Sequence, residues 1–195
     1  MEYQLTRVNG AFEWENIPAL SIAKVLWTED AGIRAQAQLA CDEENLYVHL
    51  SACEKEIRAE YTQPLSPVYE DSCLEFFFRQ HDCWNYFNFE INPRGCLRIQ
   101  YGPERAGRID IVRGDGAAYF DIRTGRTPEG WEVFYKIPLS FLQLFRPDWR
   151  FAGVMRANFY KCGDRTATAH YLAWAPVDTA QPDFHRPEFF GTLRF

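Results

Sequence analysis

The sequence predicts an all-β fold: a single-domain antiparallel β-sandwich of jelly-roll type with one or two short helices. Three observations support it. Apolar residues alternate with polar ones at a period of two in almost every ordered run, turn residues separate these runs, and few stretches have helical spacing. The length of 195 residues suits one hydrophobic core. We therefore treat residues 1–195 as a single domain.

The first two strands are predicted at residues 33–41 and 46–52, where apolar and polar residues alternate. The polar loop 42–45 between them is short, so the pair forms an antiparallel hairpin. About ten strands are expected in all. The remaining eight are 73–79, 84–92, 96–101, 119–123, 131–137, 153–161, 168–174 and 191–195.

Turns and helices complete the predicted order. The segments 92–95 (NPRG) and 127–130 (TPEG) contain the residues that tight turns require, so each should close a hairpin. Residues 139–145 follow a proline and have helical spacing, and residues 54–61 are a second candidate helix. Many short strands with so little helix favour two packed sheets over βαβ units.

Composition and charge exclude several classes of protein. Hydrophobic residues make up 47% of the chain and aromatic residues 16%, enough for a large core, so the chain is not disordered. The chain is acidic, with a net charge of −6, and has no stripe of basic residues of the kind that binds phosphate groups. Nucleic acid is therefore not an expected partner.

The ends of the chain and the cysteines bear on location. Residues 1–7 contain no apolar segment of a signal peptide, and no run of 18 apolar residues exists. We expect no membrane association and a cytoplasmic location; a secreted protein with its leader removed would look the same. The six cysteines include no C-x-x-C pair, which predicts free thiols in a reducing compartment. They are Cys41, Cys53, Cys73, Cys83, Cys96 and Cys162.

Several strands carry a polar face opposite an apolar one. In residues 84–92, Phe and Ile residues share one face, and amide, acidic and aromatic residues share the other. Similar faces occur at 73–79 and 153–161. If they adjoin, a concave surface would gather Glu75, Asn88, Glu90, Asn92, Arg156 and Asn158. Such a surface suits a sugar, whose hydroxyls need donors and acceptors and whose ring packs on an aromatic plane. A solvated face with cross-strand ion pairs is the simpler interpretation.

Catalytic signatures are weak. Glu75 and Glu90 have the residue type of a glycosidase pair, but among 27 acids some such pair always exists. The histidines show no metal-binding spacing, and no nucleophile-elbow or phosphate-loop motif is present. In the proline-rich tail, Arg186 and Glu188 fit a structural pair, whereas His185 fits the border of a ligand groove.

At this point the sequence resembles a known family. The segments LYV (46–48), YEDSCLEFF (69–77), YFNFEINPRG (86–95), IPLS (137–140) and FGTL (190–193) occur in an order and spacing similar to those of the carbohydrate-binding module family 9-like group. The resemblance extends from about residue 32 to residue 195.

The resemblance implies a β-sandwich that holds a terminal sugar unit between two aromatic side chains. Tyr69 stands where that family has a tryptophan, Glu75 matches the acid of the same segment, and Asn92 matches an amide. Trp174 resembles the second aromatic residue. Structural calcium also occurs in the family, but Asp42, Glu43 and Glu44 form no D-x-D-x-D-G loop. Apart from that implied calcium, no cofactor or metal is expected.

The predicted function is therefore non-catalytic binding of a mono- or oligosaccharide, with carbohydrate as the partner. The predicted ligand-binding residues are Tyr69, Glu75, Asn88, Glu90, Asn92, Arg156, Asn158, Trp174 and His185. One alternative is a glycoside-active enzyme that uses Glu75 and Glu90. Another is a DOMON-like haem or redox module ligated by Met155 and His170. A scaffold or protein-interaction role is the third.

Overall fold

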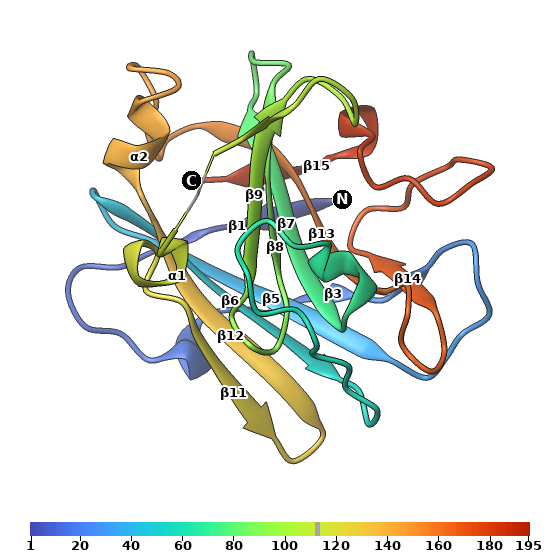
Figure 1. Ribbon diagram of the computed structural model, residues 1–195. Coiled ribbons are helices and arrows are strands. Elements are labelled where there is room, and N and C mark those ends of the chain that lie inside the picture. Colours follow the sequence, from blue (N-terminus) through green and yellow to red (C-terminus); the bar gives the residue numbers. More distant parts are fainter. Residues whose placement is uncertain (112–113) are drawn as a thin grey trace.

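Two β-sheets packed face to face form the molecule (Figure 1). The computed structural model describes residues 1–111 and 114–195. Within them, nine strands form sheet A: β1 (Glu2–Gln4), β15 (Gly191–Arg194), β13 (Val154–Gly163), β7 (Cys73–Gln80), β8 (Tyr86–Ile91), β9 (Leu97–Gly102) and β10 (Ile109–Asp110) in spatial order, with β14 (His170–Ala173) on β13 and β4 (Lys24–Val25) on β14.

Sheet B has six strands. Their order is β11 (Arg123–Thr127), β12 (Gly130–Pro138), β6 (Asn45–Cys53), β5 (Arg34–Cys41) and β2 (Thr6–Arg7), with β3 (Leu20–Ile22) also on β5. The helical segments are short: α1 (Gly116–Tyr119), α2 (Leu139–Gln143), and the 3-10 turns η1 (Trp14–Asn16), η2 (Val68–Glu70) and η3 (Pro187–Phe189). Among the described residues, no helix has the length and apolar character needed to cross a membrane.

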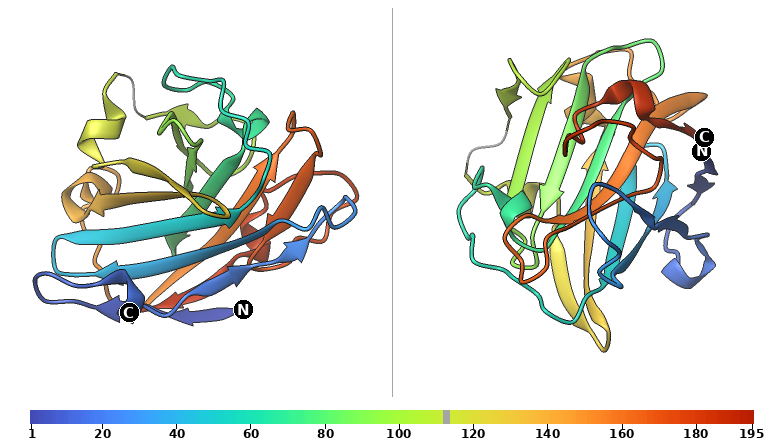
Figure 2. Two further views of the ribbon diagram at one scale, coloured as in Figure 1. Left: turned by 90° about the horizontal axis from the view of Figure 1, so that it is seen from below. Right: turned by 90° about the vertical axis from the view of Figure 1, so that its right-hand side faces the viewer.

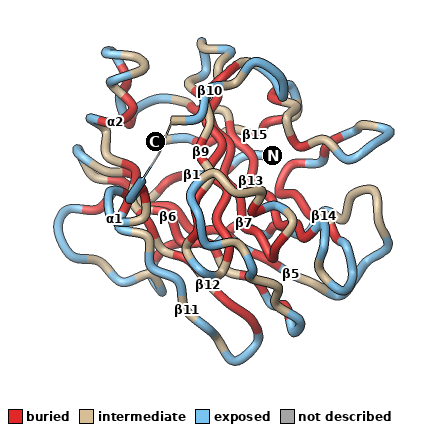
Figure 3. Tube along the Cα trace, in the orientation of Figure 1, coloured by how far each residue is buried: buried red, intermediate tan, exposed pale blue. Residues whose placement is uncertain are grey.

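The core lies between the sheets and is rich in aromatic rings. Phe76 of β7 stacks on Phe159 of β13 with ring centroids 4.6 Å apart, and Phe89 of β8 stacks on Tyr135 of β12 at 5.9 Å. Figure 3 shows the buried residues concentrated along the strands and the exposed ones on the loops. Apolar residues at alternate positions supply this core, as the period-two pattern predicts.

The predicted β-sandwich is confirmed. The hairpins at 92–95 and 127–130 join β8 to β9 and β11 to β12, and α2 forms within the predicted helix 139–145. Pairing is antiparallel except at two short edge pairs, β1 with β15 and β2 with β5, which are parallel. Consequently β1 and β15 lie side by side, and the two termini lie near each other in the right-hand view of Figure 2.

Two predicted elements were wrong. The segment 119–123 is not a strand: helix α1, capped by the Asp115 side chain on Ala118 N, is followed by a turn, and β11 begins only at Arg123. The segment 54–61 is not a helix. The backbone N–H groups of Glu60 and Tyr61 donate to the Asp71 side chain, not to backbone carbonyls of the preceding turn as they would in a helix. These bonds hold the end of the segment in a non-helical conformation.

The outer face of sheet A is partly covered. Residues outside the strands pack on it: Val68 of η2, and Phe184 and Phe190 from the segment between β14 and β15, contact Phe77 and Tyr160 of the sheet. Because this cover is incomplete, it leaves a depression over β7, β8 and β9.

Candidate functional site

A pocket of about 230 Å³ lies on the outer face of sheet A. Strands β7, β8, β9 and β13 supply its floor, and β14 together with the loops around residues 27, 69, 105–108 and 182–185 supplies its walls. The lining residues are Trp27, Tyr69, Glu75, Glu90, Arg98, Gln100, Arg105, Arg108, Cys162, Asp164, Tyr171, Pro182, Asp183, Phe184 and His185.

Two buried carboxyl groups form the centre of the floor. Glu75 on β7 and Glu90 on β8 are directly opposite each other across the sheet and are 2% and 3% exposed. The Cys162 thiol donates to Glu75 Oε1 at 3.1 Å. Burial raises the pKa of both carboxyl groups, and the neighbouring Glu90 raises that of Glu75 further.

Two buried polar atoms near this floor lack a hydrogen-bond partner in the described part of the chain. Asn88 Nδ2 donates to Glu90 Oε1 at 2.6 Å, and Arg98 Nε lies 4.0 Å from Glu90 Oε2. Glu90 Oε2 and Asn88 Oδ1 are buried and have no hydrogen-bond partner among the described residues. Since buried polar atoms without partners cost free energy, a hydrogen-bonding ligand at Glu90 would relieve the deficit.

A hydrogen-bonded group of side chains forms one wall. Arg108 donates to the Tyr86 hydroxyl at 2.9 Å, to His185 Nδ1 and to Gln100 Oε1 at 2.6 Å. The Tyr86 hydroxyl lies 2.9 Å from the same His185 nitrogen. Burial and the arginine charges, chiefly that of Arg108, lower the pKa of His185 to about 2, so this imidazole is a neutral acceptor at Nδ1.

Aromatic rings form the rim of the pocket. Tyr69 is 38% exposed. Trp27 and Tyr171 also line the pocket, with ring centroids 5.7 Å apart, and Trp27 Nε1 donates to Thr179 O at 2.7 Å. These contacts hold Trp27 in a left-handed backbone conformation, φ 54°, which an L-residue rarely adopts.

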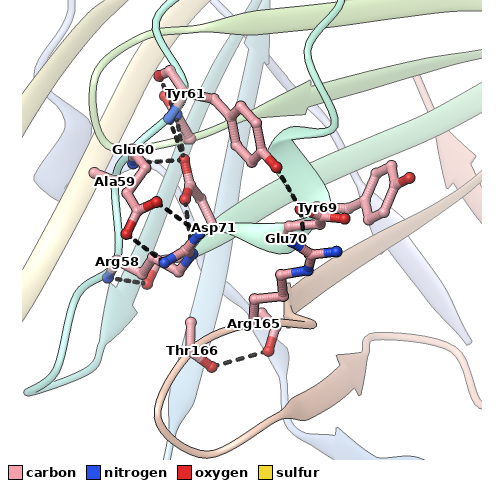
Figure 4. Close-up of polar contacts among 12 residues, drawn as sticks. Arg58, Ala59, Glu60, Tyr61, Tyr69, Glu70, Asp71, Arg165 and Thr166 are labelled. Carbon is pink, nitrogen blue, oxygen red and sulfur yellow. Dashed lines mark hydrogen bonds and ion pairs between the residues drawn. The ribbon is translucent and has the colours of Figure 1, made fainter.

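Tyr69 is placed by the polar cluster around Asp71 (Figure 4). Asp71 Oδ2 accepts from the backbone N–H of Glu60 and Tyr61 and from Asn92 Nδ2, and Arg58 pairs with Oδ1 at 3.2 Å. The backbone N–H of Asp164 donates to Tyr69 O at 3.1 Å. Figure 4 shows the Tyr69 ring projecting away from Asp71, so the cluster fixes the backbone and leaves the ring free for contact.

The structure brings together four of the nine residues predicted to bind a ligand. Tyr69, Glu75, Glu90 and His185 line the pocket, and Asn88 supports Glu90 from beside it. The strand register places five of the six expected polar residues on the outer face of sheet A, since Asn92 follows the end of β8, and Phe77 separates Asn88 from Asn158.

The remaining four have structural contacts away from the pocket. Asn92 holds Asp71 and the 92–95 turn, and Asn158 exchanges hydrogen bonds with the Ala175 backbone at 2.9 Å. Arg156 donates to Thr192 Oγ1 at 2.7 Å and to Phe190 O. Trp174 is 2% exposed in the sandwich core, against Phe159 and Gly191.

Trp174 therefore does not stand at the pocket, and removing it would open a cavity in the core rather than a groove. Trp27 and Tyr171 lie at the rim in its place. Tyr171 precedes Leu172 on β14, so alternation places Tyr171 and Trp174 on opposite faces. Two further lining residues, Arg98 and Gln100, were not predicted. They lie on the outer face of β9, and their alternation with the apolar residues of that strand could have identified them from the sequence. Loop residues such as Trp27 and Arg108 carry no such signal.

The residues named for the other interpretations have structural surroundings of their own. Met155 is buried in the core, and His170 is bonded at both ring nitrogens, to Lys161 Nζ at 2.7 Å and to Thr168 O at 2.8 Å. These two residues therefore do not form an axial haem pair. Asp42 accepts from the backbone of its own turn and from Tyr47. With both of its oxygens used in this way, and Glu43 and Glu44 exposed, the turn does not fit calcium.

A larger hollow, about 860 Å³, lies at the end of the sandwich among residues 31–33, 53–57, 126–130 and 166–170. Its buried polar groups are already paired: Glu54 accepts from Ser72 at 2.8 Å and from Trp131 at 3.1 Å, and Lys161 lies 3.2 Å away. The smaller pocket, with its unpaired acceptors and exposed aromatic ring, is the stronger candidate.

Comparison with known proteins gives consistent results. A candidate carbohydrate-binding protein from Bacteroides uniformis is 27% identical and superposes with a TM-score of 0.83, covering 98% of this chain and 97% of that one. A carbohydrate-binding module family 9 from Caldicellulosiruptor kristjanssonii in complex with glucose is 15% identical (TM-score 0.68, 100% and 95% covered), and one in complex with cellotriose is 14% identical (TM-score 0.67, 100% and 93%). No curated protein matches the sequence.

The family model of carbohydrate-binding family 9 matches residues 6–195, nearly the whole chain. The β-sandwich and the covered outer face of sheet A lie within this match. The chain belongs to carbohydrate-binding family 9.

Proposed function

We propose that the pocket binds a mono- or short oligosaccharide without chemical change. The observation that carries the proposal is that buried polar atoms without partners, at Glu90 and Asn88, occur in the floor of a pocket that the exposed ring of Tyr69 also lines. A sugar presents hydroxyls to the first and a C–H face to the second. Family membership and the glucose and cellotriose complexes of the Caldicellulosiruptor modules support the same ligand class.

The size of the pocket favours a short ligand. Its volume of about 230 Å³ is below the range of roughly 300–1,000 Å³ that holds drug-sized molecules. One or two sugar rings suit that space, with any further ring outside. Each hydrogen bond exchanged with water contributes only about 1 kcal/mol. After association entropy is subtracted, we expect a dissociation constant on the order of micromolar to millimolar.

The geometry favours binding over hydrolysis. The two carboxyls of a glycosidase flank the scissile bond. Glu75 and Glu90 are instead cross-strand neighbours, both buried in the floor beneath the pocket. Both also hold contacts on the floor, Glu75 to Cys162 and Glu90 to Asn88. This arrangement matches a hydrogen-bonding floor better than an acid and a base.

Calorimetric titration with glucose, cellotriose and a panel of other saccharides tests the proposal. Tyr69→Ala should weaken binding about 2- to 10-fold, because an aromatic packing contact contributes about 0.5–1.5 kcal/mol. Tyr119→Ala is the matched control: Tyr119 is 50% exposed on α1 and does not line the pocket.

Two results would contradict the proposal. One is a wild-type protein that binds no member of the panel; the other is a Tyr69→Ala variant that binds as tightly as wild type. A reducing-sugar assay on the same oligosaccharides should stay at background, and release of new reducing ends would instead support a glycoside-active enzyme.

A further inference from the structure

Two cysteines and a glutamate meet at the floor of the pocket. Cys73 on β7 and Cys162 on β13 are direct partners across the sheet, and Glu75 follows Cys73 on the same face. Their Sγ and carboxylate atoms all lie within 4.8 Å of one another, and all three residues are buried. In the described ranges, 1–111 and 114–195, this is the one group of three or more such side chains with metal-ligand spacing.

We propose that Cys73, Cys162 and Glu75 form a site for a thiophilic divalent cation of the Zn²⁺ or Cd²⁺ class. Tetrahedral zinc takes sulfur at about 2.3 Å and carboxylate oxygen at about 2.0–2.2 Å, which places the ligand atoms roughly 3.5–3.8 Å apart. Cys162 Sγ and Glu75 Oε1 are 3.1 Å apart. Small side-chain rotations therefore suffice to enclose an ion.

The ligand atoms have little to lose on binding an ion. Cys73 Sγ contacts its own strand at Leu74 O, 3.9 Å away, and Cys162 Sγ contacts Tyr69 O at 3.7 Å besides Glu75. Thiol hydrogen bonds are weak. Two thiolates and a carboxylate carry three negative charges, so the site with a divalent ion would have a net charge of −1, which the Arg108 side chain in the same pocket would partly offset.

The pocket supplies an entry path and a fourth ligand. Cys162 and Glu75 line it, whereas Cys73 lies behind them. An ion bound by the three side chains keeps one coordination position toward the pocket, open to water. Ordinary thiols are mostly protonated at neutral pH, so both cysteines must release protons when they bind an ion.

Cobalt titration of the reduced, chelator-treated protein is the direct test, because thiolate ligation gives Co²⁺ a near-ultraviolet charge-transfer band. We expect the band to saturate at one ion per chain and to disappear when Zn²⁺ is added. Cys73→Ser and Cys162→Ser should each lose most of the band and at least tenfold in affinity. Cys53→Ser, at an exposed cysteine bonded to Glu129, should keep both.

Measurements on the wild type keep the test decisive if a serine variant folds poorly. Zn²⁺ should protect two of the six thiols from alkylation, and peptide mapping should identify them as Cys73 and Cys162. Binding should also release about two or three protons per ion at neutral pH. Absence of the cobalt band, or protection of other cysteines, would overturn the site.

The ion and a sugar would share Glu75, an expectation that rests on the proposed function. Saturating Zn²⁺ should therefore weaken saccharide binding, and by linkage saccharide should weaken zinc binding by the same factor. The cobalt titration contains no sugar, so failure of the metal site and failure of the sugar site are separate results. Equal saccharide affinity with and without bound Zn²⁺ would contradict the assignment of Glu75 as a ligand.

Discussion

Lys161→Met should destabilise the fold by about 3–5 kcal/mol, because it leaves a buried charge without its partner. Lys161 is fully buried on β13 and lies 3.2 Å from the Glu54 carboxylate. It also donates to Cys162 O at 2.8 Å and to His170 Nε2 at 2.7 Å. Methionine fills a similar volume but offers no donor, so Glu54 would keep the hydrogen bonds from Ser72 and Trp131 and the His170 ring nitrogen 3.6 Å away, but no lysine charge.

Urea unfolding monitored by circular dichroism measures this loss. In a thermal scan of the same variant, the melting temperature should fall on the order of 10 °C, since for a chain of this size 1 kcal/mol corresponds to about 2–4 °C. Lys24→Met, at an exposed position on β4, is the control and should change stability by less than about 0.5 kcal/mol. The double variant Lys161→Met with Glu54→Gln should recover part of the lost stability, because it removes the unpaired charge as well. A loss below about 1 kcal/mol in Lys161→Met alone would show that the fold does not need the ion pair.

Glu75→Gln should weaken saccharide binding and at the same time stabilise the fold at neutral pH. The amide keeps the carbonyl acceptor but replaces the carboxyl hydroxyl, which can both donate and accept, with an NH2 group that only donates, so a sugar hydroxyl loses a matched partner. A loss of about 1–2 kcal/mol, or roughly 5- to 30-fold, is expected. A function in catalysis would instead show as turnover lost by orders of magnitude.

The stability gain follows from the pKa of Glu75. Burial and the Glu90 charge raise that pKa well above its usual value of 4.5, so the folded state binds the proton more tightly than the unfolded state. The contribution of Glu75 to stability is therefore complete below about pH 4.5 and is lost as the pH rises through the raised value. Glutamine does not titrate and escapes this loss.

Denaturant unfolding between pH 4 and pH 8, with a chelator present, should show the variant gaining on wild type as the pH rises. Glu43→Gln, exposed in the loop between β5 and β6, is the matched control and should follow wild type throughout. A variant whose advantage does not grow with pH would mean that Glu75 is not held neutral by its surroundings.

Local alternation predicted the floor of the site but not its walls. Glu75 and Glu90 could be assigned to the outer face because Phe and Ile residues occupy the alternate positions of β7 and β8. The same rule, applied to β14, separates Tyr171 from Trp174, and the family motif pointed the other way. Trp27 and Arg108 reach the pocket through loops, whose course depends on tertiary contacts such as Trp27 Nε1 to Thr179 O.

The position of β13 in sheet A has a consequence for how the chain folds. It pairs with β7, far upstream in sequence, and with β15 at the end of the described chain, which in turn pairs with β1 at its start. Such distant partners must meet by closing long loops, which places folding in the millisecond-to-second range typical of β-sandwiches. During synthesis the pocket floor cannot assemble until β13 has emerged from the ribosome. Until then β7 presents an unpaired edge with its phenylalanines exposed, and this is the stage at which aggregation is the greatest hazard.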